Sequence, residues 1–173
     1  MKQILEEIKM HLDPLEIKTI LSLAEAPEST SALELHEEYP KKVIVKAGLN
    51  LINDLIDDYF ITKHVDNTQP LPFDDNMMDA IILLGGLCYC FDNKPCGGFD
   101  NANEFFSEIF RVLNKNNNSA FCYLNGAGVS PDTIIDRLDL WDGILTELSS
   151  LHNFLFERHI VHESFFGYKI YRR

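Results

Sequence analysis

The chain has 173 residues, of which 46% are hydrophobic and 24% charged, a composition typical of one globular domain with a sizeable core. Its formal net charge of −12 at pH 7 repels a phosphate backbone, which excludes nucleic acid as a partner of the chain by itself. No apolar run is long enough to span a bilayer. Glu6 and Glu7 near the start are unlike a secretory signal. We therefore expect a cytoplasmic location and no membrane association.

Taken in order, the chain alternates helical and strand-like segments. Residues 1–18 place apolar side chains at helical spacing, which predicts an N-terminal helical segment ahead of an α/β core over residues 19–173. Apolar, often β-branched runs predict seven strands. These strands lie at residues 19–23, 43–47, 59–65, 79–84, 120–124, 154–161 and 165–171. The helices between them are predicted at residues 29–39, 49–58, 102–113 and 131–151, the last as one helix or two.

The helix at residues 49–58 is expected to turn Leu51, Ile52, Leu55 and Ile56 inward, because these four side chains share one helical face. Regular alternation of helices with apolar strands is typical of an open α/β sheet with helices on both faces. The chain shows neither an internal repeat nor a linker. One domain over residues 1–173 is therefore expected.

Residues 20–30, I-L-S-L-A-E-A-P-E-S-T, resemble the first strand and cofactor loop of class I S-adenosylmethionine-dependent methyltransferases, V-L-D-L-G-C-G-P-G-S. Residues 71–79, L-P-F-D-D-N-M-M-D, are similar to the family's L-P-F-x-D-N-x-F-D segment, and residues 108–113 are similar to its E-I-x-R-V-L helix end. The two closing strands resemble its final antiparallel hairpin. This resemblance implies a Rossmann-like fold with a mostly parallel seven-stranded sheet and an antiparallel C-terminal hairpin.

The resemblance also implies where a cofactor would lie, and the chain departs from the family there. Ser22 stands in the acidic position of the first strand, and the three glycine positions are changed. The ribose-binding acid of the second strand is replaced as well. The remaining positions follow the third and fourth strands, where Asp66 or Asn67 could serve. The vestigial cofactor positions are Ser22, Ala24, Ala26, Glu28, Ala47, Asp66, Asn67, Leu84 and Gly85.

These departures predict that cofactor binding is lost. Glycine lets a ligand approach the backbone and a Cβ obstructs it. Glu28 adds bulk and charge at the mouth of the following helix, and the methyl group of Ala47 cannot accept a hydrogen bond from a ribose. The sequence therefore favours a pseudoenzyme without catalytic residues or cofactor, acting as a binding or scaffold module with a protein partner or in a homo-oligomer.

Two alternatives stay open. An active methyltransferase could hold S-adenosylmethionine through a divergent pocket, since methyl transfer depends mainly on positioning; its substrate would be a small molecule or a protein. The second alternative is a pocket that binds a different ligand. Glu28 at a helix start would then favour a cation.

Other polar residues are expected to be structural. Asp79 stands before an apolar strand, and nothing pairs Asp74 and Asp75 with a catalytic partner. Cys88, Cys90 and Cys96 lack the paired C-x2-C spacing of zinc sites, so reduced thiols and no metal are expected.

Overall fold

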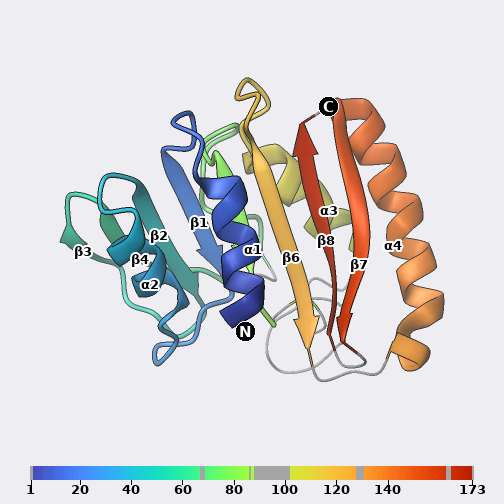
Figure 1. Cartoon of the computed structure of the whole chain (residues 1–173), viewed down its shortest axis with the longest axis horizontal. Helices are drawn as coiled ribbons and strands as arrows, with labels where there is room; N and C mark the ends of the chain where they lie inside the picture. The colour runs from blue at the N-terminus through green and yellow to red at the C-terminus, as the bar shows by residue number, and fades with distance from the viewer. Residues whose placement is uncertain are drawn as a thin grey trace.

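The computed structural model describes residues 2–66, 69–85, 87, 102–127, 131–162 and 165–172. In these ranges four α-helices accompany one sheet with the strand order β3-β4-β2-β1-β5-β6-β8-β7 (Figure 1). The strands are β1 (Thr19–Leu23), β2 (Val43–Gly48), β3 (Asp54–Asp57), β4 (Phe60–His64), β5 (Ala80–Leu83), β6 (Phe121–Ala127), β7 (Phe154–His162) and β8 (Phe165–Arg172). The helices are α1 (Lys2–Leu12), α2 (Ser31–Glu38), α3 (Ala102–Val112) and α4 (Pro131–His152).

The middle of the sheet is parallel. β1 pairs with β2 on one side and β5 on the other, while β4 adds to β2 and β6 adds to β5. β8 runs antiparallel between β6 and β7, which makes the C-terminal hairpin. All seven predicted strands are present, with β3 as an eighth at one edge. The predicted α/β class, mostly parallel with an antiparallel hairpin, is confirmed.

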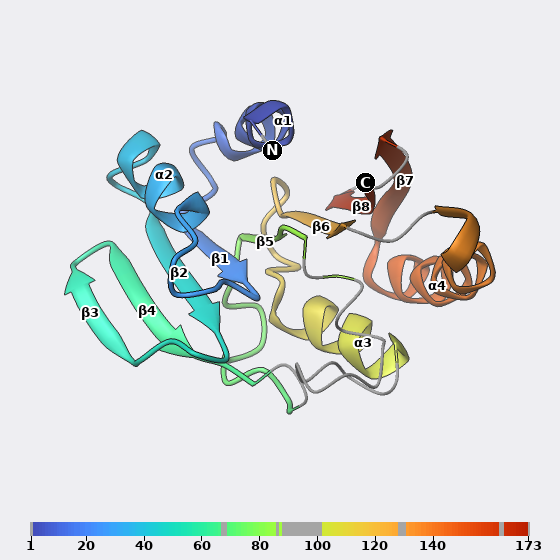
Figure 2. The ribbon, with the colours of Figure 1, turned by 90° about the horizontal axis from the view of Figure 1, so that it is seen from below.

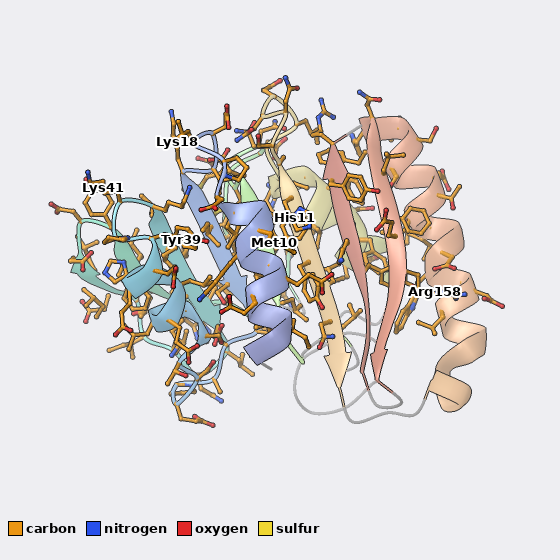
Figure 3. All side chains as sticks on the ribbon, viewed as in Figure 1. Met10, His11, Lys18, Tyr39, Lys41 and Arg158 are labelled. Carbon is orange, nitrogen blue, oxygen red and sulfur yellow. The ribbon has the colours of Figure 1, made fainter. Side chains whose placement is uncertain are left out.

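The helices form two layers, with α1 and α2 on one face of the sheet and α3 and α4 on the other (Figure 2). One core cluster lies on the α1 and α2 side and includes Ile8 and Leu35; a larger one, including Phe106, lies on the α3 side. His11 of α1 lies over β6 and stacks on Phe121, with ring centroids 4.3 Å apart (Figure 3). None of the described helices is long and apolar enough to cross a bilayer.

The helix predicted over residues 49–58 is wrong. After β2 the chain turns and runs back as β3, which pairs antiparallel with β4. Leu55 and Ile52, expected to point inward, are 62% and 75% exposed. A parallel crossover needs about a dozen residues or more, and the connection from Gly48 to Phe60 is too short for two turns and a packed helix. Pairing with β4 satisfies the backbone instead.

The two segments that most resemble the methyltransferase family contact each other. Arg111 of α3 donates to the backbone oxygens of Leu71 and Phe73, at 2.8 Å each, and to Asp75 at 2.9 Å. Glu108 bonds Arg111 and accepts the N–H of Leu71 at 2.8 Å. These bonds, led by the one from Arg111, outweigh burial and hold the pKa of Glu108 below its ordinary value. The L-P-F segment is therefore fastened to α3 just before β5.

Asp79 joins three strands at the edge where the parallel strands begin. Its carboxylate accepts the N–H groups of Lys18 at 2.9 Å and Thr19 at 3.1 Å, ahead of and at the start of β1. It also accepts the side-chain amides of Asn114 at 2.9 Å and Asn117 at 2.8 Å, in the turn before β6. Burial opposes ionisation, but these four bonds outweigh it and lower the pKa of Asp79. The geometry supports a structural role.

We expect Asp79→Ala to lower the free energy of unfolding by about 1–3 kcal/mol, because it leaves four partly buried donors without their acceptor. Since the folded pKa of Asp79 is lowered, its contribution is complete above the unfolded pKa of about 3.9. It is lost as the pH falls through the folded pKa. Urea titrations of both proteins at several pH values measure this. A stability difference that stays constant down to about pH 2 contradicts the assignment.

Candidate functional site

The candidate site lies at the carboxyl edge of the parallel strands, where β1 is flanked by β2 on one side and β5 on the other. The strand order reverses direction at this point, and open α/β sheets bind ligands in such places. The register pairs Ser22 with Lys46 of β2 and with Ile82 of β5. The predicted positions at the ends of these strands, Ala47, Leu84 and Gly85, therefore share one edge with Ser22.

Two further predicted cofactor positions, Asp66 and Asn67, come after β4. Asp66 follows β4, next to Val65, whose N–H donates to the oxygen of Gly48 at 3.1 Å. Asp66 therefore lies at the same edge, beside the end of β2. Asn67 lies outside the described residues.

Ala24 keeps a backbone conformation that favours glycine. Its φ is 59°, in the left-handed region, where a Cβ crowds the following carbonyl. This is the first of the three positions at which the resembled family has glycine. The loop therefore keeps its turn after β1 despite the alanine. The half-buried Ala24 side chain packs against the core cluster on the α3 side.

Glu25 places a buried carboxylate inside the loop. Its side chain is 7% exposed and accepts hydrogen bonds from the hydroxyl of Ser22 and from that of Ser31 at 2.9 Å. Ser31 is the first residue of α2, so the negative charge lies at the positive end of that helix and stabilises it. A carboxylate is thus present beside Ser22, but it belongs to the loop and is bonded within it.

Lys46 of β2 hydrogen-bonds the same loop from the strand beneath it. Its side chain is 7% exposed, and its ammonium group donates to the backbone oxygens of Pro27 at 3.0 Å and Ser29 at 2.7 Å. A buried charge of this kind is tolerated only when it is well hydrogen-bonded. The bonds tie the middle of the loop to the strand beneath it.

The loop also rests directly on the end of β2. The N–H of Glu25 donates to the oxygen of Ala47 at 2.9 Å. A Cβ built on Gly48 would lie 1.9 Å from the oxygen of Glu25. Only glycine fits at this close approach. Ala47 is fully buried and belongs to the core cluster on the α3 side.

The remaining predicted cofactor positions are Ala26, Glu28, Leu84 and Gly85, and these residues are placed differently from one another. The side chains of Ala26 and Glu28 are exposed on the loop, so the bulk of Glu28 is directed to solvent. Leu84 is half-buried and packs against the core on the α1 and α2 side. Gly85 has a φ of 74°, which provides the turn after β5.

Asn125 of β6 borders the same edge. It is 2% exposed, and its side-chain oxygen accepts the N–H of Gly85 at 3.4 Å. Its side-chain nitrogen has no hydrogen-bond partner in the described part of the chain.

Sequence reasoning missed Glu25, Lys46 and Asn125 as residues of this edge. Motif comparison considers only the family's own positions, and Glu25 falls on the variable one between two glycines. A signal for Lys46 was present, since it is a charged residue inside the apolar run V-I-V-K-A. A lysine in a buried strand is tolerated only where hydrogen-bond acceptors surround its ammonium group.

The described ranges contain no group of three His, Cys, Asp or Glu side chains placed to hold a metal ion. Cys88, Cys90 and Cys96 lie outside those ranges. Cys122 of β6 is fully buried, and burial raises the pKa of its thiol. This thiol is therefore a packing group, not a nucleophile.

No protein-family model matches the chain, and no curated protein matches it by sequence. Solved structures do resemble it. A Methanococcus maripaludis protein, provisionally an S-adenosyl-L-methionine-dependent methyltransferase, is 15% identical with a TM-score of 0.61, over 98% of this chain and 83% of that one. Precorrin-6y C5,15-methyltransferase of Geobacter metallireducens is 11% identical with a TM-score of 0.59, over 99% and 87%.

Human N-acetylserotonin methyltransferase, solved in complex with S-adenosylmethionine, is 11% identical with a TM-score of 0.57. The match covers 97% of this chain and 51% of that one. At such identities the likeness shows the fold. The chain therefore has the fold of the class I S-adenosylmethionine-dependent methyltransferases, as its motifs predict.

We expect Gly48→Ala to destabilise the protein by about 2–3 kcal/mol, because the new Cβ would overlap a backbone oxygen that cannot move without the loop. Gly143→Ala is the matched control. Gly143 lies in α4, and its added Cβ meets nothing within 4 Å. That change should stabilise by up to about 1 kcal/mol through helix propensity. Urea denaturation of both variants measures the difference, and equal effects would contradict the close approach.

Ala24→Gly should raise the free energy of unfolding by up to about 1 kcal/mol, because the relief of a left-handed alanine exceeds the added freedom of the unfolded chain and the lost packing of one half-buried methyl group. Ala26→Gly is the control, since Ala26 lies in the same loop without a positive φ. There the added freedom of the unfolded chain should cost about 0.5 kcal/mol. Thermal and urea melts report both changes. A gain in both variants would mean that loop flexibility, not the backbone angle, is responsible.

Proposed function

We propose that this chain is a non-catalytic methyltransferase-like domain that works by binding another protein. The observation that carries the proposal is the internal bonding of the loop after β1. The carboxylate of Glu25 is engaged by two serine hydroxyls, and the ammonium group of Lys46 is engaged by two loop carbonyls. Charged groups that already have hydrogen-bond partners within the loop offer little to a zwitterionic cofactor.

The position of Ala47 supports the same proposal. A ribose anchor needs a hydrogen-bond acceptor facing the cofactor. Ala47 has no such group, and its side chain is packed in the core instead. Three independent cofactor contacts of the resembled family, the acid of β1, the glycine loop and the acid of β2, are thus replaced together.

The charge around α2 points the same way. The N-terminus of a helix ordinarily attracts the anionic part of a ligand. Here the buried carboxylate of Glu25 already lies at that end, bonded to Ser31. A carboxylate or phosphate from a ligand would meet like charge.

An active methyltransferase is the second candidate, and one observation favours it. Ala24 and Gly85 both keep left-handed backbone angles, so the turns after β1 and β5 retain shapes that suit glycine. The polar side chain of Asn125 borders the same edge. Methyl transfer requires mainly that the reactants be held in line, so such an edge could serve if the cofactor binds.

Calorimetric titration with S-adenosylmethionine and S-adenosylhomocysteine separates the two candidates. We expect no saturable heat and no thermal shift up to about 1 mM ligand, a range that reaches binding free energies of about −4 kcal/mol. Human N-acetylserotonin methyltransferase, solved with S-adenosylmethionine, is the positive control for the ligand stock. Saturable binding in the micromolar range would overturn the proposal and favour the enzyme.

A further inference from the structure

The strand β3 forms an open edge of the sheet. It lies at the end of the strand order and pairs only with β4 within the described chain. All four of its residues, Asp54–Asp57, are exposed. Figure 2 shows β3 at the outer end of the sheet, and α2 reaches it on one face, where His36 contacts Asp57. An edge of this kind presents backbone N–H and C=O groups to which another strand can add.

Apolar side chains gather along this edge and the turns on either side of it. They belong to the exposed large hydrophobic residues of the described chain. The set comprises Leu49 (39% exposed), Ile52 (75%), Leu55 (62%), Ile56 (58%) and Tyr59 (42%). A contiguous exposed apolar patch on a soluble protein commonly marks an interaction surface.

The two faces of β3 differ in chemistry. Asp54 lies opposite Thr62, and Asp57 lies opposite Phe60. Thr62 and Phe60 are two apart in β4 and so share a face. This is the face toward α2, since His36 of α2 contacts both Asp57 and Phe60. Leu55 lies opposite Ile61 and so projects from the other face. The pairing register shifts at Ile56, between Leu55 and Asp57. Asp54 and Asp57 therefore share the face toward α2, and Leu55 lies on the other face.

Charge argues against a second copy of this chain as the occupant. Residues 49–60 contain Asp54, Asp57 and Asp58 and no lysine or arginine. Antiparallel self-pairing of β3 would bring these acids close to the same acids of the second copy, and directly opposed like charges destabilise a strand pair. Each chain also carries a net charge of −12, which adds repulsion. A cationic strand would instead find complementary charge.

We propose that the open edge of β3 is a docking site for an extended, basic segment of a partner protein, which adds to the sheet as a further strand. Alternating lysine or arginine and aliphatic residues fit it, because one face of the added strand would meet Asp54 and Asp57 and the other Leu55. The inference rests on the proposed function in that the domain is taken to work by binding a protein. It does not depend on whether the cofactor edge is occupied.

The test uses a capped heptapeptide with the sequence Lys-Val-Lys-Val-Lys-Val-Lys, with Glu-Val-Glu-Val-Glu-Val-Glu as the charge-reversed control. Fluorescence anisotropy gives the Kd, and amide chemical shifts and hydrogen exchange locate the binding. We expect saturable binding of the basic peptide with a Kd below about 500 µM. The amides of β3 should shift and gain protection, while the acidic peptide should not bind.

Two variants test the edge itself. Ile56→Lys places a cation in the apolar patch, and Asp54→Lys reverses one charge of the acidic face. Each should weaken the basic peptide about tenfold. Leu140→Lys is the matched control, because Leu140 of α4 is 59% exposed, against 58% for Ile56, and lies far from β3. It should change the Kd by less than about twofold.

Three results would overturn the proposal. These are no saturable binding, equal binding of both peptides, or shifts located away from β3. A concentration-dependent dimer in sedimentation that Ile56→Lys abolishes would also overturn it, in favour of self-pairing. The cofactor titration is a separate measurement on the same protein. If the peptide does not bind and calorimetry shows no cofactor binding, only the docking proposal fails and the non-catalytic domain stands. If the peptide binds and the cofactor also binds, the docking proposal stands and only the non-catalytic assignment fails.

Discussion

The carboxylate of Asp79 is the interaction on which the arrangement of the central strands depends. It receives the first N–H groups of β1 and the amides of the turn that leads into β6, while its own backbone continues into β5. One side chain thus sets the start of three neighbouring strands. Because these strands are parallel, fixing their starts also fixes where their carboxyl ends meet. The positions of the strand ends at the candidate site, on the opposite edge, therefore depend on this carboxylate and on the hydrogen bonds from Arg111 to the L-P-F segment.

Within the described structure, the loop after β1 has backbone angles that suit glycine, while its charged side chains are hydrogen-bonded inside the loop. Ala24 holds the left-handed turn, and Gly48 still admits the backbone of Glu25. The charged side chains of Glu25 and Lys46 then bond the loop itself. A backbone made for close approach can therefore be retained for folding alone, since it fastens β1, β2 and α2 together. Retained shape is weaker evidence for binding than the direction in which polar groups point.

Sequence reasoning recovered β1, β2, β5 and β6 because each is an apolar run of the kind that a buried parallel strand accommodates. The two closing strands were recovered from their resemblance to an antiparallel hairpin. Sequence reasoning failed for residues 49–58, where Leu51, Ile52, Leu55 and Ile56 fit a helical face equally well. The decision there depended on how β2 connects to β4, which is a tertiary property. At the site, motif comparison identified the departures from the family pattern at Ser22 and Ala47 but missed the buried carboxylate of Glu25. A new contact at a variable position has no family pattern to reveal it.

The same departure from the predicted helix explains why the surface is unusual at one edge. A packed helix would have buried the apolar residues that follow β2, whereas an outer strand leaves them exposed beside unpaired backbone groups. An exposed edge of this kind promotes self-association, and proteins commonly prevent this with charged side chains at the edge. Asp54, Asp57 and Asp58 provide that charge here. In the proposed docking, the same three residues oppose self-pairing of β3 and favour a partner of opposite charge, so resistance to aggregation and specificity for a basic strand have one cause.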